Sequence, residues 1–509
     1  MPNSLTIHLQ NQTNHSQLFA YITGLALQHN NARVFLRSDG RGLYYPQSPP
    51  PGKILQPMAE DCAIWLGHPG NTVSVTIPQI AGGRIWFSSG EKRLTFLLNP
   101  GGPGGGAALV EPSVLNPSDP NADVDFAFAE FTLNNDQLFA NISYVDFVPR
   151  LPVALTLQTR GGQVQHVSGM APDGLQRVCD GLRAQAARDG RPWDKLIVPQ
   201  RGGATGIPLR ALAPTHGNAV GASFDGYFEP LVDAAWEKYR EGGSASSSSH
   251  GHGHAAPPPI PPRPQQQQQQ QQHGNHHHGL LSSLTSRIRN HPFNPINNRP
   301  SALAADGGSA PPIPPRPAGF HHQPLSHSHS HSHHPTHQTN FQKLRINTQA
   351  AAGIVEGSIP PGSQDLIIAN ERFPKPTTAD ILGCNSGPFS TAGASPTKLA
   401  IIPRLAAAFQ RSCITDCCDH PSDPCTFYKC HDCPDGWDRD QRRGGERPTN
   451  HYARIVHECN LDGKGYAFAY DDVQPDGGID QSGKVNAGDP AVFIVAVGGG
   501  GAYVGDRMP

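Results

Sequence analysis

Residues 128–148, FAEFTLNNDQLFANISYVDFV, decide the fold class of the N-terminal part of this chain. Apolar and polar side chains alternate on both sides of a polar centre at 134–137, and this period of two is typical of β-strands. Two carboxylates, Glu130 and Asp146, stand inside the apolar pattern. Because burying a charge without a partner is costly, we expect both side chains to face an open groove.

Short strands of the same kind fill residues 1–165, separated by turns rich in Gly, Pro and Asn. Examples are SLTIHLQN at 4–11, TVSVTIP at 72–78 and GRIWFSS at 83–89. Many short strands at regular spacing predict a β-sandwich or barrel rather than a parallel sheet.

A mixed α/β part with closing strands is predicted for residues 166–240 and 342–509. Apolar residues at helical spacing predict helices within 172–190 and 227–243, the first of them with Asp173 as its N-cap. The sequence therefore divides its folded part into a β domain and a mixed domain.

The C-terminal segments contain one more predicted helix and one more predicted strand. The helix is expected to start at Pro403, since proline suits the first helical position, and GKGYAFAYDDV (463–473) alternates as a strand does. His451 and His457 are expected on a helix, with a structural role. The aspartates at 471–472 either line a groove or cap a turn.

Residues 241–341 break the pattern with a polyglutamine run, histidine-rich tracts and few bulky apolar side chains. Such a segment cannot bury enough apolar surface to offset its conformational entropy, so we predict a disordered insert. It carries PPIPPRP twice, at Pro258–Pro264 and Pro311–Pro317. This form suits a Src-homology-3-type partner, which would bind both copies by avidity, although proline-rich spacers also produce it by chance.

Composition excludes several function classes. A formal net charge of −2 gives no electrostatic reason to expect nucleic acid or an anionic membrane as partner. No apolar run is long enough to span a bilayer. The N-terminal residues lack the basic start and apolar stretch of a secretory signal, so the sequence as read predicts no standard secretion; a start placed too far downstream would look the same.

The ten cysteines are unevenly placed, with seven between Cys413 and Cys459 and three standing alone at Cys62, Cys179 and Cys384. Their spacing matches no zinc pattern, so disulfides or free thiols are favoured over a metal. We expect neither a metal nor an organic cofactor.

Five stretches together resemble one protein family. They are VEPSVLNPSDPN (110–121), the run at 128–148, PTTADILGCNSGPF (376–389), IPRLAAAFQRS (402–412) and PTNHYARIVHECNLDGKGYAFAYDDV (448–473). They resemble, in the same order, glycoside hydrolase family 64, which comprises mostly secreted endo-β-1,3-glucanases related in fold to thaumatin-like proteins. The resemblance implies a thaumatin-like β-sandwich or barrel domain, a mixed α/β domain, and a wide cleft between them for one β-1,3-glucan chain.

The resemblance also implies functional residues. Glu130 and Asp146 match the family's catalytic pair, which hydrolyses the glucan with inversion and releases short laminarioligosaccharides. Thr132 and Asn134 match polar residues that contact sugar. Phe139 stands where the family often has Trp, so stacking on sugar is expected to be weaker. The alternative is a non-catalytic, thaumatin-like glucan-binding wall protein, or an intracellular scaffold.

The chemistry needs one protonated carboxyl and one ionised carboxylate. Phe128, Ala129 and Phe131 surround Glu130 in the sequence, and their apolar character is expected to keep it protonated as the general acid. Asp146 is then the general base.

The spacing of the pair makes a geometric prediction. Residues paired directly across a wide loop lie roughly 5 Å apart at Cβ, whereas a tight turn at 134–137 would leave Glu130 and Asp146 about four strand positions, or roughly 13 Å, apart. Inversion needs roughly 6.5–9.5 Å between the carboxyl groups. We therefore predict a wide, open connection between the two strands.

Overall fold

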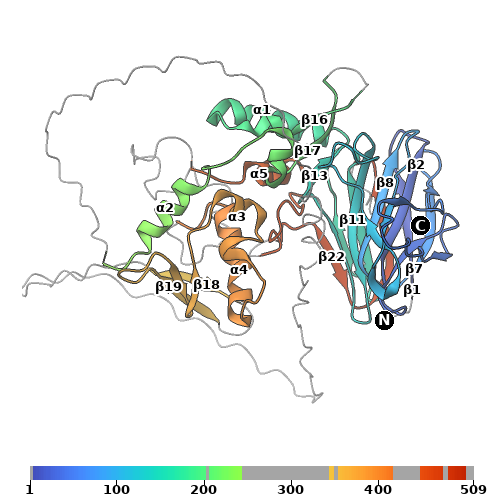
Figure 1. Ribbon diagram of the computed structural model, residues 1–509. Coiled ribbons are helices and arrows are strands. Elements are labelled where there is room, and N and C mark those ends of the chain that lie inside the picture. Colours follow the sequence, from blue (N-terminus) through green and yellow to red (C-terminus); the bar gives the residue numbers. More distant parts are fainter. Residues whose placement is uncertain are drawn as a thin grey trace, which may run out of the picture. The chain divides into compact units, whose positions relative to one another are not determined.

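The computed structural model describes residues 4–201, 206–242, 343–348, 353–415, 447–473 and 480–499, and Figure 1 shows its strands and helices. The predicted insert, both proline-rich motifs and the cysteines between 417 and 433 lie outside the described residues, apart from 241–242 at the insert's start. Those predictions therefore remain predictions.

Strands dominate the regular structure of the described chain up to residue 167, as the alternation predicts. The strands are β1 (Ser4–Asn11), β2 (Leu18–Ala26), β3 (Ala32–Leu36), β4 (Leu43–Tyr44), β5 (Gln56–Pro57), β6 (Ile64–Trp65), β7 (Thr72–Pro78), β8 (Ile80–Ser89), β9 (Leu97–Asn99), β10 (Ala108–Val110), β11 (Asp125–Leu133), β12 (Leu138–Ile142), β13 (Phe147–Pro149), β14 (Val153–Thr159) and β15 (Val164–Val167). The strands that follow are β16 (Ile197–Pro199), β17 (Pro208–Leu212), β18 (Leu344–Asn347), β19 (Ile354–Ser358), β20 (Leu366–Ile368), β21 (Glu371–Phe373), β22 (Lys484–Ala487) and β23 (Pro490–Val497).

Two large sheets dominate. The five-stranded sheet has the order β15-β14-β23-β1-β7, and the eight-stranded sheet has the order β22-β12-β11-β8-β2-β3-β4 with β6 paired to β2 (Figure 1). The closing strands β22 and β23, predicted within the mixed part, thus pair with the N-terminal strands. Among the described strands of these two sheets, β1 and β23 pair in parallel, and all other pairs are antiparallel.

The core follows from the alternation of side chains along each strand. In β11, Ala127, Ala129 and Phe131 lie in one buried cluster with residues of β1, β14 and β23 from the other sheet. Phe126 and Phe128 point to the opposite face, where they join a second cluster with residues of β9 and β10. One face of the eight-stranded sheet therefore packs on the five-stranded sheet, and the prediction of a mainly β fold is confirmed.

The helices are α1 (Gly174–Asp189), α2 (Glu229–Lys238), α3 (Thr378–Gly383), α4 (Pro396–Gln410) and α5 (His451–Cys459), with short 3-10 helices η1 (Pro103–Gly105), η2 (Pro192–Leu196), η3 (Pro214–Val220) and η5 (Gly387–Phe389). The predicted helices at 172–190 and 227–243 are α1, directly after Asp173, and the shorter α2.

The predicted start of the third helix at Pro403 is wrong. α4 begins seven residues earlier, at Pro396, and Pro403 lies inside it. The Ser395 side chain accepts a hydrogen bond from the Lys398 N–H at 3.0 Å and so caps the helix. Both Pro396 and Pro403 suit the first position of a helix, and the Ser395 cap fixes the start at Pro396.

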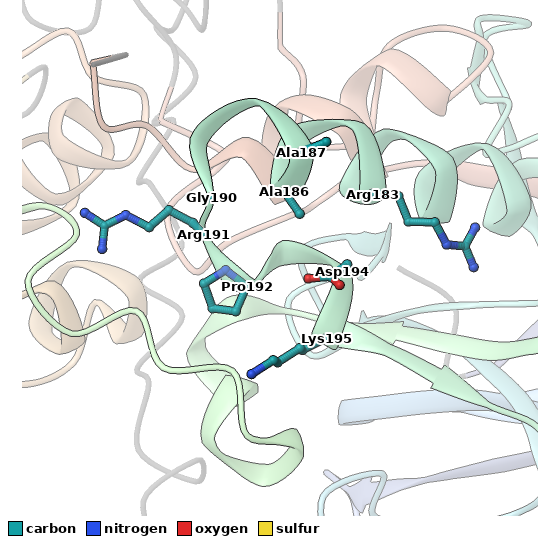
Figure 2. A pocket seen from close by; sticks show the side chains of 8 residues that line it. All are labelled: Arg183, Ala186, Ala187, Gly190, Arg191, Pro192, Asp194 and Lys195. Atoms are coloured by element: carbon teal, nitrogen blue, oxygen red, sulfur yellow. The ribbon is translucent and has the colours of Figure 1, made fainter. Parts of the chain in front are cut away.

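A surface hollow lies where α1 ends and η2 begins (Figure 2). Gly190 ends α1 in the left-handed conformation at φ 69°, which turns the chain toward η2. None of the residues that the sequence singles out as a site lines the hollow. The lining residues are Arg183, Ala186, Ala187, Gly190, Arg191, Pro192, Asp194 and Lys195.

The predicted strand at 463–473 is wrong. The segment forms turns, and an isolated bridge joins its Tyr466 to Ser143. The carboxylate of Asp471, which is fully buried, accepts a hydrogen bond from the Ala467 N–H at 2.8 Å. A buried carboxylate that binds its own backbone competes with a strand ladder, so Asp471 caps a turn and does not line a groove.

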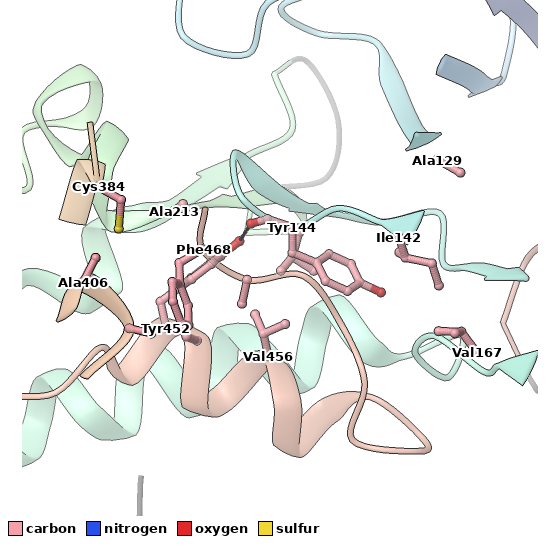
Figure 3. Close-up of a cluster of buried hydrophobic side chains, with 14 of the residues drawn as sticks. Ala129, Ile142, Tyr144, Val167, Ala213, Cys384, Ala406, Tyr452, Val456 and Phe468 are labelled. Carbon is pink, nitrogen blue, oxygen red and sulfur yellow. Dashed lines mark hydrogen bonds between the residues drawn. The ribbon is translucent and has the colours of Figure 1, made fainter. Parts of the chain in front are cut away.

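Helix α5 packs on the end of β12 (Figure 3). The Tyr452 hydroxyl donates a hydrogen bond to the Tyr144 carbonyl at 2.7 Å, and Val456 and Phe468 lie in the same buried cluster. His451 and His457 lie on α5 and are buried, in agreement with the predicted helix. This packing fixes the chain just before Asp146.

The three isolated cysteines, Cys62, Cys179 and Cys384, are buried free thiols. Burial raises the pKa of each to about 12, which keeps these thiols protonated. Among the described helices, none combines the length and apolar character that crossing a membrane needs.

Candidate active site

The connection between β11 and β12 is a tight hairpin, so the prediction of a wide, open connection is wrong. The Asn134 N–H donates to the Gln137 carbonyl at 3.1 Å. The Asn134 Oδ1 atom accepts from the N–H groups of Asp136 and Gln137, at 2.9 and 2.8 Å. An asparagine that binds the backbone two and three residues on closes a turn by itself. Glu130 therefore lies opposite Asn141.

Asp146 nevertheless does not lie on an extension of this hairpin, because the chain leaves the eight-stranded sheet after β12. Ser143 bridges to Tyr466, and β13, which follows Asp146, pairs with β17 in a separate sheet. The distance of roughly 13 Å expected for a tight turn assumed a straight continuation along the ladder. Arg84 lies within electrostatic reach of Asp146 and forms an ion pair with Glu130.

Arg84 of β8 lies directly opposite Glu130 of β11. Its Nε and Nη2 atoms are 3.2 and 3.0 Å from Glu130 Oε1, and its Nη1 atom is 2.7 Å from Glu111 Oε2. Burial alone would lower the pKa of Arg84, but the charges of Glu111, Glu130 and Asp146 outweigh it and raise that pKa above its usual value. Arg84 is therefore a permanent positive charge among three carboxylates.

The expected apolar surroundings of Glu130 are largely wrong. Ala129 and Phe131 belong to the core on the other face of the sheet, because neighbouring residues of a strand point to opposite faces. Phe128 shares the face of Glu130, and its ring lies 4.7 Å from the Arg84 guanidinium. Glu130 therefore lies beside a charged guanidinium and one aromatic ring, not in an apolar pocket.

His216 of η3 holds Asp146. Its Nε2 atom lies 3.0 Å from Asp146 Oδ1, and the Ala213 N–H donates to the Asp146 carbonyl at 2.9 Å. Burial raises the pKa of Asp146, but the hydrogen bond and charge of His216 and the charge of Arg84 outweigh burial and hold the pKa below its ordinary value. Asp146 is therefore kept ionised.

Both carboxylates remain open to solvent. The side chain of Glu130 is 28% exposed and that of Asp146 is 33% exposed. Neither is sealed in the core, so both can meet a ligand.

The predicted sugar-contacting residues lie along the same hairpin. Thr132 follows Glu130 by two positions and so shares its face, and Phe139 lies opposite Thr132 on β12. Both are half-buried. Asn134 lies at the turn, where its Oδ1 atom is already used by the backbone.

Three further residues of this site were missed by the sequence reasoning. Arg84 is a charge inside an apolar strand, which is the same signal that singled out Glu130. Glu111 lies in one of the stretches that carry the family resemblance but was given no role. His216 lies in η3, shortly after β17, and nothing in its sequence surroundings points to Asp146. Among the described residues, no group of three or more His, Cys, Asp or Glu side chains is arranged to hold a metal ion.

Comparison with known proteins gives the family. The family model described as β-1,3-glucanase, glycoside hydrolase family 64, matches residues 3–252 and 337–497. Glucan endo-1,3-β-glucosidases of Cellulosimicrobium cellulans and of an Arthrobacter species (strain YCWD3) are each 29% identical to this chain over 240 residues. These matches cover 47% of this chain and 40% of each relative, so the chain spans less than half the length of the curated relatives it matches.

Solved structures share the fold. A laminaripentaose-producing β-1,3-glucanase in complex with laminaritetraose has a TM-score of 0.64 at 22% identity, with 97% of this chain and 99% of that chain covered. A family 64 β-1,3-glucanase domain from Clostridium beijerinckii has a TM-score of 0.57 at 17% identity, with 97% and 98% covered. With a family model that matches more than half of its residues, this chain belongs to the β-1,3-glucanases of glycoside hydrolase family 64.

Proposed function

We propose that this protein is an endo-β-1,3-glucanase that cleaves internal β-1,3-glucosidic bonds with inversion. The observation that carries the proposal is the pair of carboxylates, Glu130 and Asp146, which are both open to solvent and both interact with Arg84. Family membership and the names of the curated relatives support the substrate class. Wall or storage β-1,3-glucan of the laminarin type is the proposed substrate, in a cleft beside these residues.

Asp146 is the proposed general base. A base must be ionised to take a proton from the attacking water, and His216 and Arg84 hold Asp146 in that form. Glu130 is the proposed general acid, which protonates the leaving oxygen. Thr132 and the amide nitrogen of Asn134 would bind sugar hydroxyls, and Phe139 would pack against a sugar ring.

One observation favours the alternative function, a thaumatin-like protein that binds β-1,3-glucan without cleaving it. Glu130 forms an ion pair with Arg84 at 3.0 Å, and such a pair contains the ionised carboxylate. An ionised carboxylate cannot act as a general acid.

Sugar release from laminarin by the wild type, Glu130→Gln and Asp146→Asn separates the two functions. We expect both variants to lose activity by about 100-fold or more, because each removes a proton-transfer group. Asp136→Asn, an exposed carboxylate in the turn of the same hairpin, is the matched control and should keep full activity.

Full activity in either site variant would overturn the residue assignment. Wild-type protein that sediments with insoluble glucan but releases no sugar would establish the binding alternative. Proton NMR of the first products tests inversion, which requires the α-anomer to appear first from a β-linked substrate.

A further inference from the structure

Arg84 is shared between two carboxylates that arrive from different strands. Its Nη1 atom contacts Glu111 at 2.7 Å, and its Nε and Nη2 atoms contact Glu130 at 3.2 and 3.0 Å. Glu111 directly follows β10, which belongs to the small sheet β10-β9-β5, whereas Glu130 lies in the eight-stranded sheet. The two carboxylates therefore compete for one guanidinium.

This sharing bears on the proton of Glu130. If Arg84 paired with Glu130 alone, the full positive charge would stabilise the carboxylate and oppose proton uptake. Glu111 places a negative charge beside Arg84, which offsets the positive charge felt by Glu130 and disfavours a second carboxylate there. This effect of Glu111 acts toward a protonated Glu130.

A second observation concerns the partner of that proton. Asn141 lies directly opposite Glu130 on β12 and is 2% exposed, and its Oδ1 atom has no hydrogen-bond partner among the described residues. Directly opposed residues of antiparallel strands lie about 4.5–5.5 Å apart at Cβ. A carboxylate cannot donate to an amide oxygen, but a protonated carboxyl group can.

We propose that Glu111 is a positioning residue for the cleavage reaction, which lets Glu130 take up its proton by holding Arg84, and that Asn141 accepts the hydrogen bond of the protonated form. The proposal rests on the proposed function. It accounts for how a carboxyl group that is ion-paired at rest acts as a general acid.

The other charged or titratable groups around Glu130 are accounted for. Asp146 also acts on Arg84, and Tyr466 lies within electrostatic reach of Glu130. Burial raises the pKa of Tyr466 well above its usual value, with further contributions from nearby carboxylates, so its hydroxyl stays neutral. Lys484 lies opposite Asn141 on β22 and pairs with Asp480 at 3.1 Å. Of these groups, Asp146 is the one coupled to Glu111, through the charge of Arg84.

The test is the pH profile of kcat/KM on laminarin. The basic limb of that profile reports loss of the proton from the general acid, and the acidic limb reports the base. In Glu111→Gln we expect the basic limb to move to lower pH by about one unit or more. The acidic limb should move less, because Arg84 acts on Asp146 more weakly than His216 does. Glu111→Asp keeps the charge on a shorter side chain, so its basic limb should lie between those of Glu111→Gln and the wild type. Glu91→Gln, at an exposed glutamate, should leave both limbs in place.

Asn141→Leu tests the acceptor. Loss of the amide oxygen should also move the basic limb to lower pH, and an unmoved limb would exclude Asn141 from the proposal. A basic limb in Glu111→Gln that coincides with the wild-type limb would overturn the role of Glu111. A wild type without activity would instead refute the proposed function.

A second readout does not need activity. Carbodiimide-driven coupling of an amine consumes protonated carboxyl groups, and peptide mass spectrometry gives its extent at Glu130. Coupling at Glu130 should require a lower pH in Glu111→Gln than in the wild type, and equal pH dependence would overturn the proposal. If thermal unfolding shows that Glu111→Gln does not fold, Glu111→Asp is measured instead. An intermediate shift is then expected, and no shift contradicts the proposal.

Discussion

At the scale of single residues, the ionisation of Asp146 depends on a histidine from another part of the chain. His216 is 17% exposed at its side chain and lies 3.0 Å from the Asp146 carboxylate, which is held below its ordinary pKa against the effect of burial. Asp146 and His216 are 70 residues apart in the sequence. The proposed base is therefore tuned by a contact that only folding creates.

Replacement of His216 by Asn should move the acidic limb of the kcat/KM profile to higher pH, by about one unit. Loss of the hydrogen bond and charge of His216 raises the pKa of Asp146, so a higher pH is needed to ionise the base. The basic limb should not move. His15→Asn, at an exposed histidine between β1 and β2, is the control. An unchanged acidic limb in His216→Asn would show that His216 does not set the ionisation of Asp146.

At the scale of elements, an extra residue in β8 directs Arg84. The pairing of β8 with each of its two neighbours shifts register just before Arg84. On β2 the shift lies between Thr23 and Leu25, and on β11 it lies between Phe131 and Leu133. Gly82 has φ 52°, which favours glycine. Bulges of this kind bend a strand and redirect a side chain next to a functional site.

Gly83→Ala should destabilise the protein by about 1–3 kcal/mol, as overpacking of a core does. A Cβ atom at Gly83 would lie 2.5 Å from the Phe131 ring, which covers it. Urea unfolding measures the change. Gly161→Ala is the matched control, because the nearest atom to its added Cβ is Thr159 Oγ1 at 3.7 Å. Equal midpoints for both variants would show that the Phe131 ring can move aside at no cost.

At the scale of the whole folded unit, one buried carboxylate connects three segments. Asp471 lies 3.0 Å from Arg411, at the end of α4, and 3.0 Å from His457 of α5. All three side chains are at most 5% exposed. Burial raises the pKa of Asp471, but the charges of His457 and Arg411 outweigh it and hold the pKa below its usual value. The turn at 463–473, which touches β12, is thereby tied to both helices.

Asp471→Asn should destabilise the protein by about 3–5 kcal/mol, because it removes one partner of a buried ion pair. The stability of the wild type should also decrease as the pH is lowered. The pKa of Asp471 is lower in the folded protein than the value of about 3.9 in the unfolded chain, so Asp471 adds stability above pH 3.9. That stability is lost as the pH falls toward the pKa of the folded state. Urea midpoints between pH 3 and pH 7 measure both effects.

The control for Asp471→Asn is Asp173→Asn, which breaks an ion pair with Arg177. Both side chains of that pair are 57% exposed. Exposed pairs of this kind contribute at most about 1 kcal/mol. If both variants unfold at the same midpoint, the buried pair does not stabilise the fold. If the acid-induced loss is as large in Asp471→Asn as in the wild type, it does not come from Asp471.

The sequence by itself determined what depends on local periodicity. Alternation placed β1, β7, β8 and β11 and gave the mainly β fold, since a period of two buries one face of a strand whatever that face packs against. The same alternation singled out Glu130 as a charge among apolar residues. Helical spacing placed α1, and Gly190 ends it in the left-handed conformation, which is also a local property. Asp173 occupies the N-cap position as predicted, but its side chain makes no capping hydrogen bond.

Only the tertiary structure decided what depends on distant contacts. The strand predicted at 463–473 became a turn because Asp471 found partners on α4 and α5, and β23 entered the sheet between β1 and β14 from the far end of the chain. The position of Asp146 followed from the change of sheet after β12, not from its spacing to Glu130. Arg84, Glu111 and His216 surround the two carboxylates for the same reason: they come from separate strands and loops, and residues far apart in sequence carry no local signal that they will meet.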